Sequence, residues 1–254
     1  MIAMLAACVN HTVRPQVTLN VMTSGGFTAA YDQLAPDYAR QNRINLIAIY
    51  GASMGGASDS IPARLARNEP ADVVILARSG IDDLARKGYV DPATITDLVR
   101  SQIGMAVKSG NPAPDISNRA AFLKTLLSAK SIGYSASASG TYLTKELFPT
   151  LAIYPQIKSK LVRIESERVA AVVARGDVEI GFQQVSEILP IPGASFAGKI
   201  PEDMQRTTIF SAGIATNSAN PAEAKRLIAH LASPKSAPTI SATGLDVVMD
   251  ADKK

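Results

Sequence analysis

The chain has 254 residues, enough for two lobes or one large α/β domain. Its net charge of +4 is spread over interspersed acidic and basic residues without a Lys/Arg run, which argues against a nucleic-acid surface and favours attraction of small anions. Cys8 is the only cysteine, and His11 and His230 are the only histidines. This composition excludes structural disulfides and thiol–metal clusters and argues against a Ser-His-Asp triad, so acid–base chemistry falls to Glu, Asp, Tyr, Lys or Ser.

Residues 1–15 form a separate N-terminal segment, and fold reasoning begins near Gln16. The segment starts with an apolar stretch that ends in Leu-Ala-Ala-Cys8, which resembles the bacterial lipobox where a lipoprotein signal is cut and its Cys is lipidated. This stretch is too short to span a membrane and lacks the basic start of a complete export signal. Two interpretations stay open: a signal remnant of a periplasmic protein lipidated on Cys8, or a chance cysteine in a frayed terminus.

The first part of the folded chain repeats one unit, in which an apolar strand is followed by a polar loop and a helix. The strands are predicted at 17–22, 45–50 and 71–76. Strands alternating with helices imply βαβ units on a parallel sheet, whose carboxyl ends carry ligand sites. The loops at these ends contain Ser24, Gly25, Gly26, Ser53, Met54 and Ser79.

The pattern restarts after a candidate crossing between two lobes. An apolar strand at 102–110 runs into the sequence Asn-Pro-Ala-Pro at 111–114, and the strand-like run at 207–217 returns toward the first lobe. Lobe 1 is therefore predicted to comprise residues 16–106 and 207–254. Lobe 2 is predicted to comprise residues 107–206.

The stretch 131–147 is the clearest candidate for a binding site. A short strand at 131–134 leads into a Ser/Gly loop and then directly into a helix that begins near Ser139, Gly140 and Thr141. Such a junction points unpaired backbone N–H groups and the positive end of a helix at one place, where a small anion can bind. An ordinary capped helix is the alternative. Because the chain makes the same junction after its first strand, we predict that the two helix N-termini face each other across a cleft.

Several long runs resemble the molybdate-binding protein family over nearly the whole folded chain. They are TSGGFTAA, GASMGG, EPADVVILA, SASGTYLTKEL, VAAVVARGDVEIGF and NPAEAKRLIAHLAS. Within that family the chain is more similar to the aconitate isomerase branch, in the runs SMGGASDSIPARLARNEPADVV, YSASASGTYL and VAAVVARGDVEIGFQQVSE. The resemblance implies the type II periplasmic binding fold, an α/β fold whose two lobes are joined by two crossing segments and enclose a ligand cleft.

The resemblance also implies a substrate-binding site with contributions from both lobes. Gly26 stands where the molybdate receptors usually offer a hydroxyl, and Gln184 stands where they usually offer a Tyr, so both departures weaken the case for molybdate. The implied site residues, extended to their neighbours in the same loops, are Ser24, Gly25, Gly26, Ser53, Met54, Ser79, Ser139, Gly140, Thr141, Tyr142, Val169, Gln183 and Gln184.

Two functions stay open. The first is a solute receptor that closes on a tetrahedral oxyanion and delivers it to an ABC permease. The second is a cofactor-independent isomerase that shifts a proton along a small tricarboxylate such as aconitate. Neutral donors can hold a compact oxyanion, whereas several carboxylates need a cation, because charge-assisted hydrogen bonds contribute about 1.5–3 kcal/mol each. Either protein is expected to act as a monomer without a metal or organic cofactor.

Arg64 is the predicted cation of the cleft, with Arg78 and Arg168 as secondary candidates. The alternative for Arg64 is a solvated position on its helix. Glu167 is the first choice for the base and Tyr142 the second, because a proton shift needs one base within reach of both carbons. Glu167 is equally well explained as a carboxylate in the first turn of a helix, where it favours the helix dipole.

Overall fold

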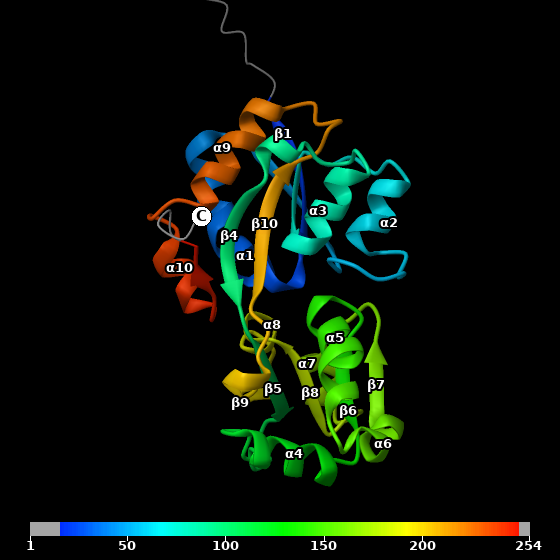
Figure 1. Ribbon diagram of the computed structural model, residues 1–254. Coiled ribbons are helices and arrows are strands. Elements are labelled where there is room, and N and C mark those ends of the chain that lie inside the picture. Colours follow the sequence, from blue (N-terminus) through cyan, green and yellow to red (C-terminus); the bar gives the residue numbers. More distant parts are fainter. Residues whose placement is uncertain (1–15, 249–254) are drawn as a thin grey trace, which may run out of the picture.

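The structure is a computed structural model that describes residues 16–248, and it consists of two lobes, each built around one sheet (Figure 1). The strands of lobe 1 are β1 (Thr18–Ser24), β2 (Asn45–Gly51), β3 (Val73–Ala77), β4 (Thr96–Ser101), β10 (Thr208–Ile214) and β11 (Asp246–Val247). They form a six-stranded sheet in the order β11-β4-β10-β3-β1-β2. Its helices are α1 (Gly25–Asn42), α2 (Ile61–Ala66), α3 (Arg78–Arg86), η1 (Pro92–Thr94), α9 (Pro221–Leu231) and α10 (Ala237–Ala242).

The strands of lobe 2 form a five-stranded sheet in the order β7-β6-β8-β5-β9. They are β5 (Ile103–Lys108), β6 (Ile132–Ser135), β7 (Leu161–Ile164), β8 (Ile180–Gln184) and β9 (Ala194–Lys199). The helices are α4 (Arg119–Ser128), α5 (Ala138–Tyr142), α6 (Tyr154–Ile157), α7 (Val169–Arg175) and α8 (Val185–Ile188). Short turns complete the lobe: η2 (Leu143–Leu147, π-helical) and the 3-10 turns η3 (Phe148–Thr150), η4 (Lys158–Lys160) and η5 (Glu202–Met204).

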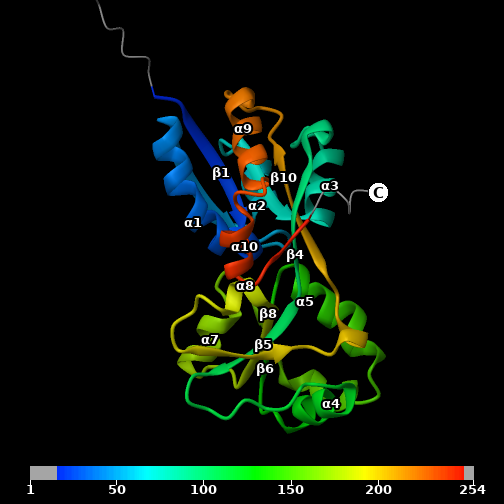
Figure 2. The ribbon, with the colours of Figure 1, turned by 90° about the vertical axis from the view of Figure 1, so that its left-hand side faces the viewer.

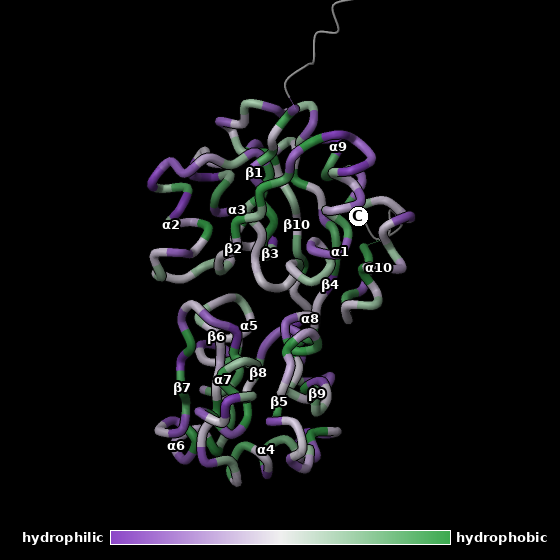
Figure 3. Tube along the Cα trace, turned by 180° about the vertical axis from the view of Figure 1, so that it is seen from behind, coloured by the Kyte–Doolittle hydropathy of each residue, from purple (hydrophilic) through white to green (hydrophobic). Residues whose placement is uncertain are grey.

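Alternation along the central strands gives the sheet of lobe 1 two apolar faces. On β3, Val73 and Ile75 point toward the core under α1 and α9, whereas Val74 and Leu76 point toward the core under α2 and α3. A strand buried on both faces reads as a continuous apolar run, which is why β3 was predictable from sequence. Hydrophobic stretches lie along these central strands in Figure 3, and hydrophilic stretches lie on the outer loops.

Both sheets are mixed, and this corrects the expectation of parallel sheets. β1 pairs in parallel with β2 and β3, and β6 pairs in parallel with β7 and β8. β10 is antiparallel to both β3 and β4, and β5 is antiparallel to both β8 and β9. The strands β4, β5, β9 and β10 enter or leave a lobe through a crossing, so no crossover helix sets their direction.

The two crossings run side by side between the lobes, as Figures 1 and 2 both show. The first is at Gln102, between β4 and β5, because residues 103–108 already pair with strands of lobe 2. The sheets therefore divide the chain here, before the predicted boundary at 106/107 and before the Asn-Pro-Ala-Pro run. The second crossing occupies residues 200–207, where the boundary was predicted at 206/207.

Cys8 and the lipobox-like run lie outside the described residues, as do residues 249–254 of the predicted lobe 1. Within residues 16–248, no helix combines the length and apolar character needed to cross a membrane.

Candidate functional site

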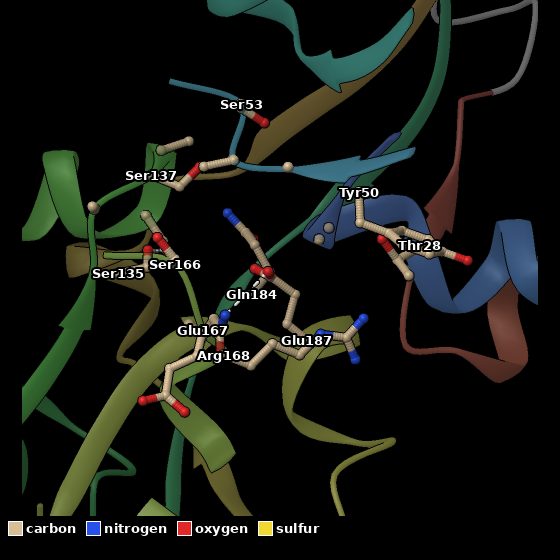
Figure 4. Close-up of a pocket in the computed structure, with 18 of the residues that line it drawn as sticks. Thr28, Tyr50, Ser53, Ser135, Ser137, Ser166, Glu167, Arg168, Gln184 and Glu187 are labelled. Atoms are coloured by element: carbon tan, nitrogen blue, oxygen red, sulfur yellow. Dashed lines mark hydrogen bonds between the residues drawn. The ribbon is translucent and has the colours of Figure 1, made fainter. Parts of the chain in front are cut away.

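A pocket of ≈ 230 Å³ lies between the lobes (Figure 4). Lobe 1 contributes the N-terminus of α1, the segment after β2, and Phe210 of β10. Lobe 2 contributes the segment from the end of β6 to the start of α5, residues 165–168 before α7, and the junction of β8 with α8. The pocket thus forms where strands of both sheets end and helices begin, as the repeated junctions in the sequence predicted.

The N-terminus of α1 reaches the pocket without a capping side chain. β1 ends at Ser24 and α1 begins at Gly25, and Ser24 makes no side-chain hydrogen bond to the helix. The Ser24 hydroxyl is buried and has no hydrogen-bond partner among the described residues. The first N–H groups of this 18-residue helix and the positive end of its dipole therefore favour an anion beside Gly25 and Gly26.

Serine hydroxyls line the opposite wall. Ser137 and Ser166 border the pocket, together with Ser135 and Ser139, whose hydroxyl oxygens lie 3.1 Å apart. Ser53 stands on the lobe 1 side, where its Oγ accepts a hydrogen bond from the N–H of Ala77 at 3.1 Å. This wall supplies neutral donors and acceptors to a polar ligand.

Arg168 is the one basic residue that lines the pocket among the residues described. It is half-buried at the start of α7, and no carboxylate within residues 16–248 forms an ion pair with it. Figure 4 shows its side chain extending along the pocket toward Glu187. An unpaired guanidinium here is suited to a planar carboxylate, which it can bind through two hydrogen bonds.

Four carboxylates line the same pocket, and three of them are engaged elsewhere. Glu165 pairs with Arg163 at 2.9 Å. Glu167 pairs with Arg175 at 2.9 Å, and the Ser166 hydroxyl donates to Oδ1 of Asp59 at 3.3 Å across the lobe boundary. The fourth carboxylate, Glu187, faces the pocket interior (Figure 4).

Glu187 lies in the single turn of α8 and is held from two sides. The Nε2 of Gln183 donates to Oε1 of Glu187 at 3.1 Å. On the lobe 1 side, the carboxylate lies against Gly25, where a Cβ would stand 1.9 Å from Oε1. Burial raises the pKa of Glu187 to about 7, although the charge of Arg168 and the hydrogen bond from Gln183 act in the opposite direction.

The structure does not favour either predicted base. The Glu167 carboxylate is exposed, is turned away from the pocket in Figure 4, and has its pKa held below the usual range by the hydrogen bonds from Arg175. The Tyr142 hydroxyl donates to the carbonyl of Met204 at 2.9 Å, and Tyr142 does not line the pocket. Burial raises the pKa of this hydroxyl, which keeps it protonated and unable to accept a proton from the substrate.

Arg64, the predicted cation, also lies outside the pocket. Its Nη1 pairs with Glu69 at 2.7 Å, and its Nε donates to the carbonyl of Asp59 at 3.0 Å. Both contacts hold the guanidinium against its own helix, between Asp59 just before α2 and Glu69 shortly after it. Arg78 is likewise engaged, with Asp82 and Asp97. The cation of the pocket is therefore Arg168, the secondary candidate.

The other predicted site residues divide into three groups. Those that line the pocket are Gly25, Gly26, Ser53, Ser139, Gln183 and Gln184. Those that line a second hollow on the lobe boundary are Met54, Ser79, Thr141 and Tyr142. The remaining three are buried: Ser24 and Val169 lie behind these surfaces, and Gly140 borders a third hollow together with Met54 and Thr141.

Sequence reasoning missed Glu187, Thr28, Tyr50, Asp59, Ser137 and Phe210. For Glu187 a signal was present, since a carboxylate three residues after the end of a buried strand falls in the first turn of the next helix. Among the described residues, no three His, Cys, Asp or Glu side chains gather as they would around a metal ion.

Comparison with known proteins identifies relatives over most of the chain. A family model described as bacterial extracellular solute-binding protein matches residues 19–246. An aconitate isomerase from Pseudomonas sp. is 42% identical over 235 residues, which cover 92% of this chain and 90% of that protein.

Solved structures confirm the predicted two-lobed periplasmic binding fold. The periplasmic molybdate-binding protein of Azotobacter vinelandii matches with a TM-score of 0.71 at 21% identity, covering 91% of this chain and 99% of that one. The sulfate-binding protein of Mycobacterium tuberculosis matches with a TM-score of 0.70 at 14% identity, covering 93% of this chain and 89% of that one.

Proposed function

The chain belongs to the bacterial extracellular solute-binding protein family, and we propose that it binds a small polycarboxylate between its lobes and interconverts trans- and cis-aconitate. The relative named aconitate isomerase matches nearly the full length of both chains, which supports the same reaction class here. The pocket is smaller than the roughly 300–1,000 Å³ that holds drug-sized ligands, so its size favours one small organic acid.

The unpaired guanidinium of Arg168 is the observation that carries this proposal. A tricarboxylate brings several negative charges into a confined space, and their desolvation is costly unless a cation or directed N–H groups compensate them. Arg168 supplies the cation, and the uncapped N-terminus of α1 supplies N–H groups on the other side of the pocket. The two elements together can hold two carboxylates of one ligand at separate places.

The reaction is an allylic proton shift. A base removes a proton from the methylene carbon of aconitate, the electron pair spreads over the three-carbon unit and its carboxylates, and a proton returns to the carbon that was vinylic. The double bond thereby moves by one position without any oxidant or reductant. Arg168 and the α1 N–H groups would stabilise the negative charge that spreads onto the carboxylates during this shift.

A second candidate function is a receptor for a small oxyanion that works with an ABC permease. The serine wall and the α1 N-terminus favour it, because neutral donors suffice for a compact oxyanion. Two features oppose it: Phe210 fills the space beside Gly26 where a hydroxyl side chain would stand, and Gln184 replaces an aromatic hydroxyl. The isomerase function therefore fits the pocket better than the receptor function.

The proposed location is the periplasm, with a lipid anchor on Cys8 as the finer hypothesis. The family consists of extracellular proteins, and the lipobox-like run before Cys8 motivates the anchor. Expression in a bacterium from a start with a complete signal should yield lipid on Cys8 and protein in the membrane fraction. Mature protein with a free Cys8 thiol would contradict the anchor.

The decisive experiment is incubation of the purified protein with trans-aconitate and detection of cis-aconitate by chromatography. Exchange of the methylene protons with deuterated water should accompany the reaction. Thermal-shift titrations with citrate, molybdate, tungstate and sulfate run in parallel. Absence of conversion and exchange, together with stabilisation by micromolar molybdate, would establish the receptor function and exclude the isomerase.

A further inference from the structure

We propose that Glu187 is the catalytic base that carries the proton between the two ends of the allylic unit, and that Gln183 and Gly25 position its carboxylate. This inference rests on the proposed isomerase function. It assigns the base to a residue of α8 instead of to either residue favoured by the sequence.

The geometry places Glu187 in the lining of the inter-lobe pocket and restricts the orientation of its carboxylate. Gln183, which is buried at the end of β8, donates to one carboxylate oxygen at 3.1 Å. The backbone at Gly25 lies directly against the same oxygen. The remainder of the carboxylate faces the pocket that also contains Arg168 (Figure 4).

The surroundings of Glu187 distinguish it from the other carboxylates of the pocket. Asp59, Glu165 and Glu167 each have a hydrogen-bonding or ion-pair partner at the pocket rim. Glu187 has no ion pair within residues 16–248, and its hydrogen bonds come from the neutral side-chain amide of Gln183 and the backbone of Gln184. Unlike Glu165 and Glu167, Glu187 is therefore held by neutral groups, and Arg168 acts on it through its charge without forming an ion pair.

Three elements surround this carboxylate and set its protonation. β8 contributes Gln183 and the backbone of Gln184, α1 contributes Gly25, and the segment before α7 contributes Arg168, the charged group that acts on it. Burial outweighs these neighbours and brings the pKa of Glu187 to about 7. A base with a pKa near the working pH can both accept a proton and give it back.

One carboxyl group is enough to carry out both proton transfers of the reaction. The Glu187 carboxylate accepts the proton from the methylene carbon while the C–H bonding electrons enter the conjugated system. The neutral carboxylic acid then returns the proton to the other end of the same three-carbon unit, and the carboxylate is restored. Because both carbons belong to one short unit, a single carboxyl group on one face of the ligand reaches both.

The first test compares Glu187→Gln with the wild-type protein. The substitution keeps size and shape but removes the base, so turnover and methylene exchange should fall by about 10²–10⁴-fold. Affinity for trans-aconitate, measured by calorimetry, should be equal or higher because a negative charge is removed from the pocket. Glu187→Asp keeps the carboxyl one methylene shorter and should recover part of the turnover. Glu202→Gln, on the exposed turn η5, is the matched control.

The second test separates a positioning role of Gln183 from a merely structural one. In the wild-type protein, kcat/KM should rise with pH through an inflection near the pKa of Glu187, since the base must be ionised. Gln183→Leu removes the hydrogen bond that stabilises the carboxylate, so this inflection should move to higher pH. A substitution that only loosened the fold would lower the rate without moving the inflection.

The outcomes separate this assignment from the proposed function. Wild-type protein that neither converts nor exchanges aconitate overturns the function and the assignment together. Active wild-type protein with an equally active, folded Glu187→Gln variant overturns the assignment alone. Loss of exchange in Glu167→Gln with full exchange in Glu187→Gln would transfer the role of base to Glu167.

Discussion

The Glu187 carboxylate and the backbone of Gly25 are packed so closely that position 25 has no room for a side chain, since a Cβ would stand 1.9 Å from Oε1 of Glu187 and 2.9 Å from its Cδ. Gly25 belongs to lobe 1 and Glu187 to lobe 2, so this contact crosses the lobe boundary. A Cβ at position 25 would push the Glu187 carboxylate aside but would not strain the backbone, because Gly25 is a helical residue without a positive φ.

Gly25→Ala should therefore displace the Glu187 carboxylate while leaving helix α1 intact. Alanine favours a helix over glycine, so the fold should tolerate the change, whereas turnover should fall at least tenfold because the base is moved. Steady-state kinetics with trans-aconitate and circular dichroism measure the two effects. Gly56→Ala is the matched control, since a Cβ there meets nothing within 4 Å. Unchanged turnover in Gly25→Ala would argue that this contact has no part in catalysis.

Arg168→Met should weaken binding of citrate and trans-aconitate by more than tenfold. Loss of a charge-assisted pair costs about 2 kcal/mol, and each 1.4 kcal/mol is about a factor of ten in Kd. Isothermal calorimetry gives the affinities. Arg119→Met removes a cation from α4, outside the pocket lining, and is the control. A larger loss of affinity in Arg64→Met than in Arg168→Met would restore the sequence-based choice of cation.

The raised pKa of Glu187 predicts a pH dependence of stability with a defined sign. The native carboxyl has a pKa of about 7 against 4.5 for the unperturbed group, so the native state holds this proton more tightly than the unfolded state. The contribution of Glu187 to the free energy of unfolding is then fully present below pH 4.5 and is lost as the pH rises to about 7. Urea unfolding at several pH values should show this decline in the wild-type protein. The Glu187→Gln variant should lack this decline between pH 4.5 and about 7. If the free energies of unfolding of the variant and the wild-type protein changed with pH in parallel, the raised pKa of Glu187 would be contradicted.

Gly26→Ser should destabilise the protein through Phe210. A Cβ at position 26 would lie 2.1 Å from Cζ of Phe210, whose ring is buried in the lobe 1 core and cannot easily move aside. Overpacking of this kind costs about 1–3 kcal/mol. Thermal unfolding should show a lowered midpoint, and the double variant Gly26→Ser/Phe210→Ala should lose less than the two single changes add up to. Full additivity would show that the two positions do not compete for space.

Sequence alone located most strands and the loops that line the pocket, because buried parallel strands are continuous apolar runs and their Ser/Gly junctions stand out. The strands β4, β9 and the two-residue β11 were not predicted, since TDLVRS and ASFAGK mix polar and apolar residues without a clear period and β11 is too short to show one. Both β4 and β9 are antiparallel strands that lead directly into a crossing. Their residues therefore do not alternate regularly between core and solvent.

The charged residues of the site were harder to assign, because helix periodicity gives the face on which a side chain lies but not the partner it meets. Arg64 and Glu167 have suitable positions in the sequence, yet Glu69 and Arg175 neutralise them in the structure. Arg168 and Glu187 form no such ion pair, and this depends on the tertiary arrangement.

Helix α8 is bound to both lobes at once. The Ser186 hydroxyl donates to the carbonyl of Gly26 at 2.7 Å. Gly244, just before β11, packs against Val185 and Leu189 so closely that an added Cβ would lie 2.9 Å or less from both side chains. A rotation of one lobe against the other that kept these contacts would open the pocket at the serine wall and leave Glu187 beside Gly25.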